Sequence, residues 1–183
     1  GVAPVVLAIT RANPSPSFRM LDRFLVITEK QQIAVVVVVN KIDLIGIEAA
    51  RHLFAVYPEL GYRVVFTSAK NDTGVDELEQ VLSGKISALS GPSGVGKSSL
   101  LNRIQPDLGL KIGALKESSN KGRHTTVVRE LIPLAGGGFV ADMPGLRTLS
   151  LWDTQPEEMD GYFPELRGLV ENCQFSNSSH VSE

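Results

Sequence analysis

Three observations predict that this 183-residue chain folds as an α/β domain, with a mostly parallel sheet between helices on both faces. Strand and helix patterns alternate along most of the chain, which is typical of such a fold. Residues 33–39 (IAVVVVV) are apolar at every position, as in a central parallel strand that is covered on both sides. A glycine-rich segment at 91–98 then joins a predicted strand to a predicted helix.

The individual elements follow from apolar spacing and turn residues. The β-branched run 4–10 predicts a strand that stops at a turn-rich loop. For the segment 33–39 the alternative is a buried helix, which its five consecutive valines disfavour. Apolar residues recur at helical spacing after Ser17, which we expect to be the N-cap. The remaining predictions are strands at 63–67 and 85–90, helices at 48–57, 76–82 and 97–104, a long loop at 105–126, and an antiparallel pair at 127–133 and 138–142.

Composition restricts the classes of function. The chain has 18 Lys and Arg against 20 Asp and Glu, a net charge of −2, which argues against unaided binding to nucleic acid, so an RNA partner would be contacted locally. The longest apolar run, 33–39, is much shorter than the roughly 20 residues that a bilayer requires, which excludes membrane insertion. The single cysteine cannot form an internal disulfide, and the printed residues contain no basic leader followed by an apolar run and a cleavage site. We therefore expect a cytoplasmic protein. We also expect it to be a monomer.

The segment GPSGVGKS at 91–98 fits the phosphate-binding pattern GxxxxGK[ST]. Its glycines let backbone N–H groups surround a phosphate chain, and the N-terminus of the following helix adds positive charge. We expect Lys97 to reach the β- and γ-phosphates and to act in catalysis, and Ser98 to bind Mg²⁺. The predicted nucleotide-binding residues of this segment are Gly91, Ser93, Gly94, Val95, Gly96, Lys97, Ser98 and Ser99.

A second motif, Asn40-Lys41-Ile42-Asp43, directly follows the valine-rich strand. The carboxylate of Asp43 can accept hydrogen bonds from two neighbouring N–H donors, and guanine presents such a pair where adenine does not. A solvated turn with a Lys–Asp pair is the alternative. The position of the motif at the carboxyl end of a central strand, where doubly wound sheets bind ligands, favours guanine recognition by Asn40, Lys41 and Asp43.

Three weaker patterns complete a nucleotide site when they are taken together. Ser68-Ala69-Lys70 follows the next predicted strand and is expected to contact the nucleotide. In the DxxG segment 142–145, Asp142 would bind Mg²⁺ and the Gly145 N–H would meet the γ-phosphate. Between these segments, Thr125 and Thr126 would supply a further hydroxyl for Mg²⁺ and contact the nucleotide.

The order of these motifs is unusual. Guanine-nucleotide hydrolases ordinarily place the phosphate loop first, whereas this chain places NKID and SAK before it. Two GTPases in tandem do not explain the order, because too few residues separate Asp43 from Gly91 and no motif has a second copy. A circular permutation explains it, since the termini of domains usually lie close together.

The motifs and their order resemble those of the circularly permuted bacterial GTPases, and in particular the family of the ribosome small-subunit-dependent GTPase A, also called RsgA or YjeQ. The segments GPSGVGKSSLLN, GRHTT and DMPGLR carry this resemblance over about residues 2–175. The resemblance implies GTP or GDP as ligand, Mg²⁺ as cofactor, and the small ribosomal subunit with its RNA as partner. It also implies an OB-fold and a zinc domain. For zinc, Cys173 and His180 match the family motif but Ser178 replaces a cysteine, so we expect weak zinc binding or none.

We therefore predict a P-loop GTPase domain over residues 1–150 and the start of a truncated, zinc-domain-like region over residues 151–183. Leu146 stands where many GTPases have a glutamine that orients the attacking water, and His124 is the candidate to replace it. The predicted function is GTP hydrolysis in maturation of the small ribosomal subunit. A scaffold that binds GTP or GDP with little turnover is the alternative, and a P-loop ATPase or kinase is disfavoured by Asp43.

Overall fold

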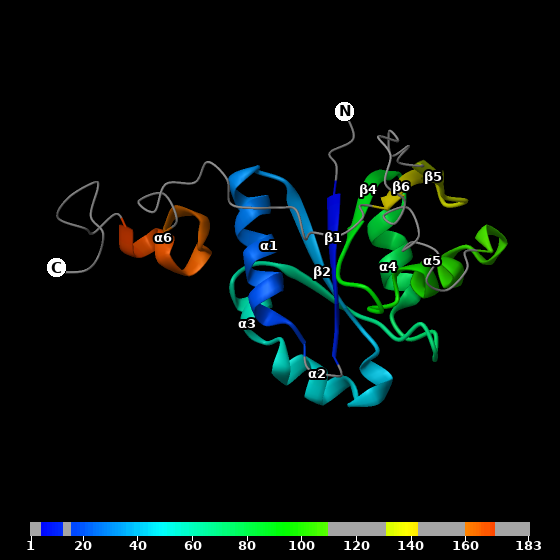
Figure 1. The fold of residues 1–183 in the computed structure, drawn as a ribbon, viewed down its shortest axis with the longest axis horizontal. Helices are drawn as coiled ribbons and strands as arrows, with labels where there is room; N and C mark the ends of the chain where they lie inside the picture. The colour runs from blue at the N-terminus through cyan, green and yellow to red at the C-terminus, as the bar shows by residue number, and fades with distance from the viewer. Residues whose placement is uncertain (1–4, 13–15, 110–130, 143–159, 171–183) are drawn as a thin grey trace, which may run out of the picture.

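The computed structural model describes residues 5–12, 16–109, 131–142 and 160–170. The described strands form one sheet in the order β3-β2-β1-β4-β6-β5 (Figure 1). All neighbouring strands are parallel except the antiparallel pair β5 and β6, as the sequence predicts. The strands are β1 (Val5–Arg11), β2 (Ala34–Asn40), β3 (Arg63–Phe66), β4 (Lys85–Ser90), β5 (Leu131–Pro133) and β6 (Gly138–Asp142).

The strand order reverses direction at β1. From β1 the chain proceeds outward to β2 and β3, and it then returns to β4 on the other side of β1. The loops that leave β1 and β4 at their carboxyl ends therefore diverge, and an open α/β sheet binds its ligands at such a crevice. The glycine-rich segment 91–96 begins at this point, directly after β4.

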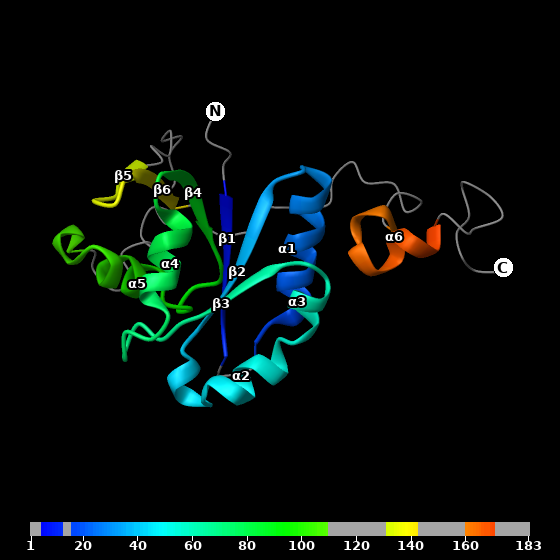
Figure 2. The same cartoon turned by 180° about the vertical axis from the view of Figure 1, so that it is seen from behind.

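Helices cover both faces of the sheet. Figures 1 and 2 show α1 and α3 on one side and α4 and α5 on the other, with α2 near the carboxyl ends of β1 and β2. None of the helices in the described part of the chain is long and apolar enough to cross a membrane. The helices are α1 (Phe18–Lys30), α2 (Ile47–Leu53), α3 (Val56–Glu59), α4 (Val75–Leu82), α5 (Lys97–Ile104) and α6 (Pro164–Val170), with short 3₁₀ helices η1 (Ile42–Leu44), η2 (Pro106–Leu108) and η6 (Asp160–Tyr162).

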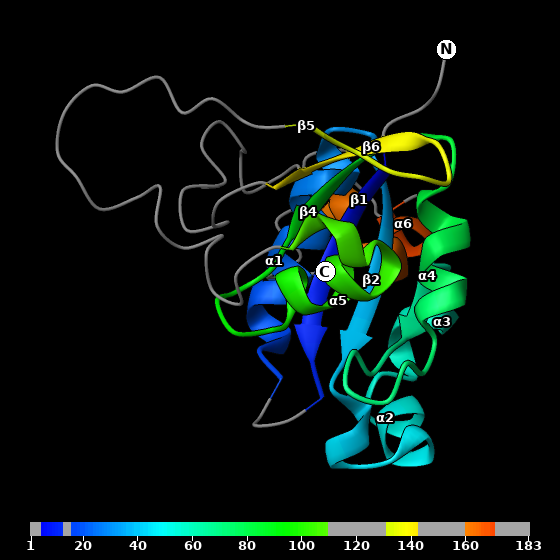
Figure 3. The same ribbon diagram turned by 90° about the vertical axis from the view of Figure 1, so that its right-hand side faces the viewer.

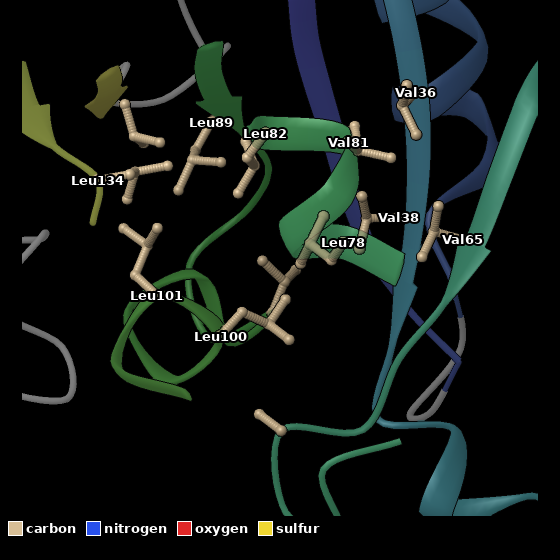
Figure 4. Packing of buried hydrophobic residues seen from close by; sticks show 13 residues of the cluster. Val36, Val38, Val65, Leu78, Val81, Leu82, Leu89, Leu100, Leu101 and Leu134 are labelled. Carbon is tan, nitrogen blue, oxygen red and sulfur yellow. The ribbon is translucent and has the colours of Figure 1, made fainter. Parts of the chain in front are cut away.

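The valines of β2 divide the core between the two faces. Val36 and Val38 belong to an aliphatic cluster with α4 and α5, drawn in Figure 4, whereas Val37 and Val39 belong to a cluster with α1, α2 and α3 that contains Phe54. Since successive side chains of a strand point to opposite faces, the unbroken apolar run supplies both clusters. The prediction of a doubly covered central strand is confirmed.

One predicted helix is wrong. Residues 48–57 do not form a single helix, because α2 ends at Leu53 and α3 begins at Val56. In a continuous helix, Pro58 would have no N–H to donate to the Phe54 carbonyl, and its ring would clash with that carbonyl. The helix therefore breaks between Leu53 and Val56. Buried Phe54 instead accepts a hydrogen bond from the Tyr57 N–H at 3.2 Å.

Other boundaries differ less. The helix after Ser17 begins as predicted, but the Ser17 hydroxyl makes no cap hydrogen bond. Within the predicted loop 105–126, the described part forms η2, and the remainder lies outside the described residues.

The segment 160–170 packs beside α1. Arg167 pairs with Glu29 near the end of α1, and the Lys30 ammonium lies 5.9 Å from the centre of the Tyr162 ring. The Tyr62 hydroxyl also donates to Glu29 Oε1 at 3.1 Å. Burial raises the pKa of Tyr62, and the negative charge of Glu29 adds to the shift.

The predicted division of the chain into a GTPase domain over residues 1–150 and a second region over residues 151–183 stays a prediction.

Candidate nucleotide-binding site

The predicted motifs leave neighbouring strands at the same edge of the sheet. NKID begins at Asn40, the last residue of β2, while SAK follows β3 and the phosphate loop follows β4. Asp142 is the last residue of β6 and lies opposite Leu89 of β4 in the parallel register. Figure 3 looks onto the sheet face that α4 and α5 cover, and it shows α5 in front of the strands. Segments far apart in the sequence are thus brought to one place.

The phosphate loop is held close to the NKID motif. Gly96 has a φ of 103°, and a Cβ atom on it would lie 2.3 Å from Asn40 Nδ2. A side chain at this position would therefore displace Asn40 as well as strain the backbone. The glycine that the phosphate-binding pattern requires is explained here by contact with the second motif.

Lys97 and Ser98 occupy the first turn of α5. The Lys97 ammonium donates hydrogen bonds to the carbonyl oxygens of Gly91 at 2.8 Å and Pro92 at 3.3 Å, so it lies across its own loop. Ser98 is buried, with an exposed fraction of 6%. The N–H groups at the start of a helix and a nearby ammonium together favour a bound anion.

Asp43 lies in η1 and is half-buried. The fully buried Ser68 donates its hydroxyl to Asp43 Oδ1 at 2.6 Å, and this bond fixes the orientation of the carboxylate. The second oxygen and the remaining lone pairs are the acceptors that the carboxylate can offer to a ligand. Sequence reasoning grouped these two residues without predicting this bond.

Asn40 links three segments through its side chain, which is 1% exposed. Its Nδ2 donates to the Val95 carbonyl at 2.8 Å, in the phosphate loop. Its Oδ1 accepts from Thr67 Oγ1 at 3.2 Å and from the Ala69 N–H at 3.3 Å. The structure therefore gives Asn40 a connecting role between the motifs, which is a more specific assignment than the contact predicted from the sequence.

Lys41 and Lys70 differ in their surroundings. Lys41 has a left-handed backbone, with a φ of 65°, and is half-buried before η1, whereas Lys70 is exposed.

Two residues of the site were not predicted from the sequence. Thr67 has no exposed surface and supports Asn40, and Arg103 of α5 donates to the Ala69 carbonyl at 2.7 Å. The position of Thr67 directly after β3 is a signal for this residue, whereas Arg103 has no comparable signal.

Several predicted site residues lie outside the part of the chain that the structure describes. Only the backbone of Asp142 is described, and within the described ranges no group of three or more His, Cys, Asp and Glu side chains could hold a metal. The predicted site residues that lie outside the described part are His124, Thr125, Thr126, Gly145, Cys173 and His180.

A phosphate loop at the point where the strand order reverses, with NKID and SAK on the neighbouring strands, defines a P-loop protein of the GTPase class with circularly permuted motifs. The family model described as RsgA GTPase matches residues 2–152, and the chain belongs to this family.

Relatives and solved structures agree with this assignment. The small ribosomal subunit biogenesis GTPase RsgA of Gemmatimonas aurantiaca is 45% identical, over 98% of this chain and 58% of its own length. The protein of the same name from Thermotoga maritima is 42% identical, over 100% of this chain and 62% of its own. The crystal structure of YjeQ from Thermotoga maritima has a TM-score of 0.77 at 39% identity, over 100% of this chain and 61% of that one.

YloQ, whose structure is described as a circularly permuted GTPase, has a TM-score of 0.70 at 34% identity, with 100% of this chain and 58% of that chain covered. The circular permutation predicted from the motif order is confirmed. The chain spans about three fifths of the length of the curated relatives that it matches.

Proposed function

We propose that the chain binds GTP and hydrolyses the bond between its β- and γ-phosphates, as part of small ribosomal subunit biogenesis. The observation that carries this proposal is the Asp43 carboxylate, which Ser68 holds at 2.6 Å, while Asn40 of the same motif donates to Val95 of the phosphate loop at 2.8 Å. Matching relatives are named small ribosomal subunit biogenesis GTPases, which supports the process.

Base selection follows from the acceptors of Asp43. Guanine carries an N–H and an amino group side by side, and a carboxylate can accept from both. Adenine offers an acceptor where guanine has its N–H, so it would leave the carboxylate without a partner and close to a lone pair. A site built to hydrogen-bond a ligand rejects an analogue that lacks the donor strongly, because its own polar groups are left unpaired.

The phosphates would bind between the loop 91–96 and the start of α5. Lys97, which now donates to the Gly91 and Pro92 carbonyls, would turn part of its donor capacity to the β- and γ-phosphate oxygens. Ammonium bonds to phosphate are charge-assisted and stronger than bonds to neutral carbonyls, so this exchange favours binding.

The residues present fit Mg²⁺. Ser98 would contribute its hydroxyl at the start of α5. Asp142, the last residue of β6 beside β4, would contribute a carboxylate. Hydroxyl and carboxylate oxygens suit this hard cation. Bound there, Mg²⁺ would neutralise charge that develops on the phosphate oxygens. Thr125 or Thr126 would add a hydroxyl, and the Gly145 N–H would meet the γ-phosphate.

His124 is proposed to orient the attacking water, because Leu146 has no hydrogen-bonding group with which to do so. We expect slow intrinsic hydrolysis that small ribosomal subunits accelerate, since binding to the subunit would bring His124 to the attacking water. A cytoplasmic location is part of the proposal. Zinc binding through Cys173 and His180 is proposed to be weak or absent, which metal analysis of protein purified without added zinc would test.

Single-turnover hydrolysis of GTP and ATP, with and without small ribosomal subunits, tests the proposal. We expect cleavage of GTP, little cleavage of ATP, and faster cleavage of GTP with subunits. Tight GTP binding without cleavage in either condition would favour a nucleotide-dependent scaffold instead. Equal use of ATP would contradict the assignment of Asp43.

A further inference from the structure

Arg103 connects the helix of the phosphate loop to the loop that supports Asp43. It lies on α5, which begins at Lys97. Its Nε donates to the Ala69 carbonyl at 2.7 Å, and its Nη1 lies 3.2 Å from Asp72 Oδ2. A single guanidinium thus binds the loop of residues 68–73 at two points, and the fixed fork of donors in arginine suits such a contact.

The loop that Arg103 binds is compact and has little room to adjust. The Ser68 N–H donates to the Thr73 carbonyl at 2.9 Å, which closes the loop. Gly74, at a φ of 67°, packs so closely that a Cβ atom would lie 2.0 Å from the Phe66 carbonyl oxygen. Displacing the Ala69 peptide would therefore displace its neighbour Ser68 as well.

Two contacts with the base-recognition residues begin on the same short stretch of backbone. Ser68 donates its hydroxyl to Asp43 at 2.6 Å, and the Ala69 N–H donates to Asn40 Oδ1 at 3.3 Å. Arg103 binds the carbonyl of the same Ala69, which lies between Ser68 and the exposed Lys70. Two hydrogen bonds and the backbone between Ser68 and Ala69 therefore connect Arg103 to Asp43.

We propose that Arg103 is a positioning residue for guanine specificity: it fixes the Ser68–Ala69 backbone and, through Ser68, the orientation of the Asp43 carboxylate. Because Arg103 lies on the helix of the phosphate loop, it also sets the distance between the phosphate end and the base end of the site. This inference rests on the proposed function, since it assumes that Asp43 binds guanine.

An ordinary surface ion pair would not have this consequence. The pair of Arg63 and Glu77, at 3.3 Å, has side chains that are about half exposed and stabilises little. Arg103 is similarly exposed, at 46%, but its shorter bond goes to a backbone carbonyl at the site. Arg63 is therefore a matched control for the loss of an arginine.

The experiment compares the affinities of GDP and of inosine 5′-diphosphate, which lacks the amino group of guanine, for the parent protein and for Arg103→Ala. Both ligands carry the same phosphates, so their affinity ratio reports the alignment of Asp43 with the guanine donors. We expect Arg103→Ala to reduce this ratio by about three- to thirtyfold, which is less than the roughly 10- to 150-fold for complete loss of a hydrogen bond to a charged group, because Arg103 acts on Asp43 only indirectly. Arg63→Ala should leave the ratio unchanged.

Two further variants separate positioning from folding. In the background of Asp43→Ala, Arg103→Ala should reduce the ratio no further, because the group that it positions is gone. Arg103→Lys keeps the charge and one donor point, so it should give an intermediate ratio, and it replaces Arg103→Ala in the comparison if that variant does not fold.

Each outcome decides one question. A parent protein without preference for GDP would contradict the proposed function itself. A parent with the preference, and an Arg103→Ala variant with the same ratio, would overturn only the inference about Arg103. Equal loss of affinity for both diphosphates would also overturn it, because Arg103 would then act on the phosphate loop or on the fold and not on base recognition.

Discussion

The base end and the phosphate end of the candidate site are built differently. At the base end, Asp43, Ser68 and Asn40 are joined by hydrogen bonds to partners from different strands and loops. At the phosphate end, the Lys97 ammonium donates to carbonyl oxygens of its own loop. These bonds preorganise the base end, whereas under the proposed function the Lys97 ammonium at the phosphate end would exchange its bonds for bonds to a nucleotide.

This difference separates specificity from affinity. A preorganised acceptor distinguishes bases by the bonds that the wrong base cannot make, and salt has little effect on that choice. An ammonium that binds phosphate attracts every nucleoside triphosphate, and salt screens part of that attraction. Substitutions at the two ends should therefore change different quantities.

The largest effect is expected from Asp43→Ala. Loss of the carboxylate leaves the guanine donors and the Ser68 hydroxyl without their acceptor, at a cost of about 2–4 kcal/mol. The preference for GTP over ATP should fall by roughly 30- to 1,000-fold, measured as the ratio of dissociation constants. Asp107→Ala, on exposed η2, is the control and should keep the preference. Full preference in Asp43→Ala would show that another group selects the base.

His124→Ala tests the residue that is proposed to orient the attacking water. We expect the hydrolysis rate stimulated by small ribosomal subunits to fall by about 100-fold, as for loss of a group that orients or deprotonates water, while the affinity for GTP is kept. Single-turnover rates with and without subunits measure this effect. If the variant is stimulated as strongly as the parent, the ribosome or the backbone holds the water.

Lys97→Ala should weaken GTP and ATP alike. Removing a charge-assisted donor to phosphate costs about 1.5–3 kcal/mol, so both affinities should fall by roughly 10- to 150-fold, with their ratio kept. The affinity of the variant should also depend less on salt than that of the parent. Lys85→Ala, at the other end of β4, serves as the control. A change in the GTP-to-ATP ratio would contradict the separation of the two ends.

The smallest effect is expected inside β4 itself. Ser87 is 1% exposed, and its hydroxyl is the one buried side-chain polar atom without a partner among the described residues. Ser87→Ala removes that unpaired group, so the free energy of unfolding should stay the same or rise by up to about 1 kcal/mol. Denaturant unfolding measures this change, and nucleotide affinity at both ends should be unaltered. A fall in stability would mean that Ser87 has a partner outside the described part.

The sequence predicts the elements best where the pattern is local. The strand 85–90 and the helix 97–104 have the predicted bounds, since the glycine-rich motif between them defines where the strand ends and where the helix begins. The break between α2 and α3 was missed because apolar spacing alone does not register the effect of Pro58 on a carbonyl four residues earlier.

For the site, the sequence predicts which motifs are present but not how they are joined. The bond from Asn40 to Val95 and that from Arg103 to Ala69 connect residues 55 and 34 positions apart. Neither bond belongs to a periodic pattern, because each depends on the order of strands in the sheet. The fixed carboxylate of Asp43 was likewise not predictable, since the hydroxyl that holds it comes from another strand's loop.

The most direct test of base recognition by Asp43 is the substitution Asp43→Asn. Asparagine keeps an oxygen that can accept from Ser68 and replaces the other oxygen with an NH₂ donor. Xanthine carries an oxygen acceptor in place of the amino group of guanine, so this donor matches it. Dissociation constants for GDP and xanthosine 5′-diphosphate should show a preference for guanine in the parent and for xanthine in Asp43→Asn. An unchanged preference for guanine in the variant would contradict the assignment of Asp43 as the residue that selects the base.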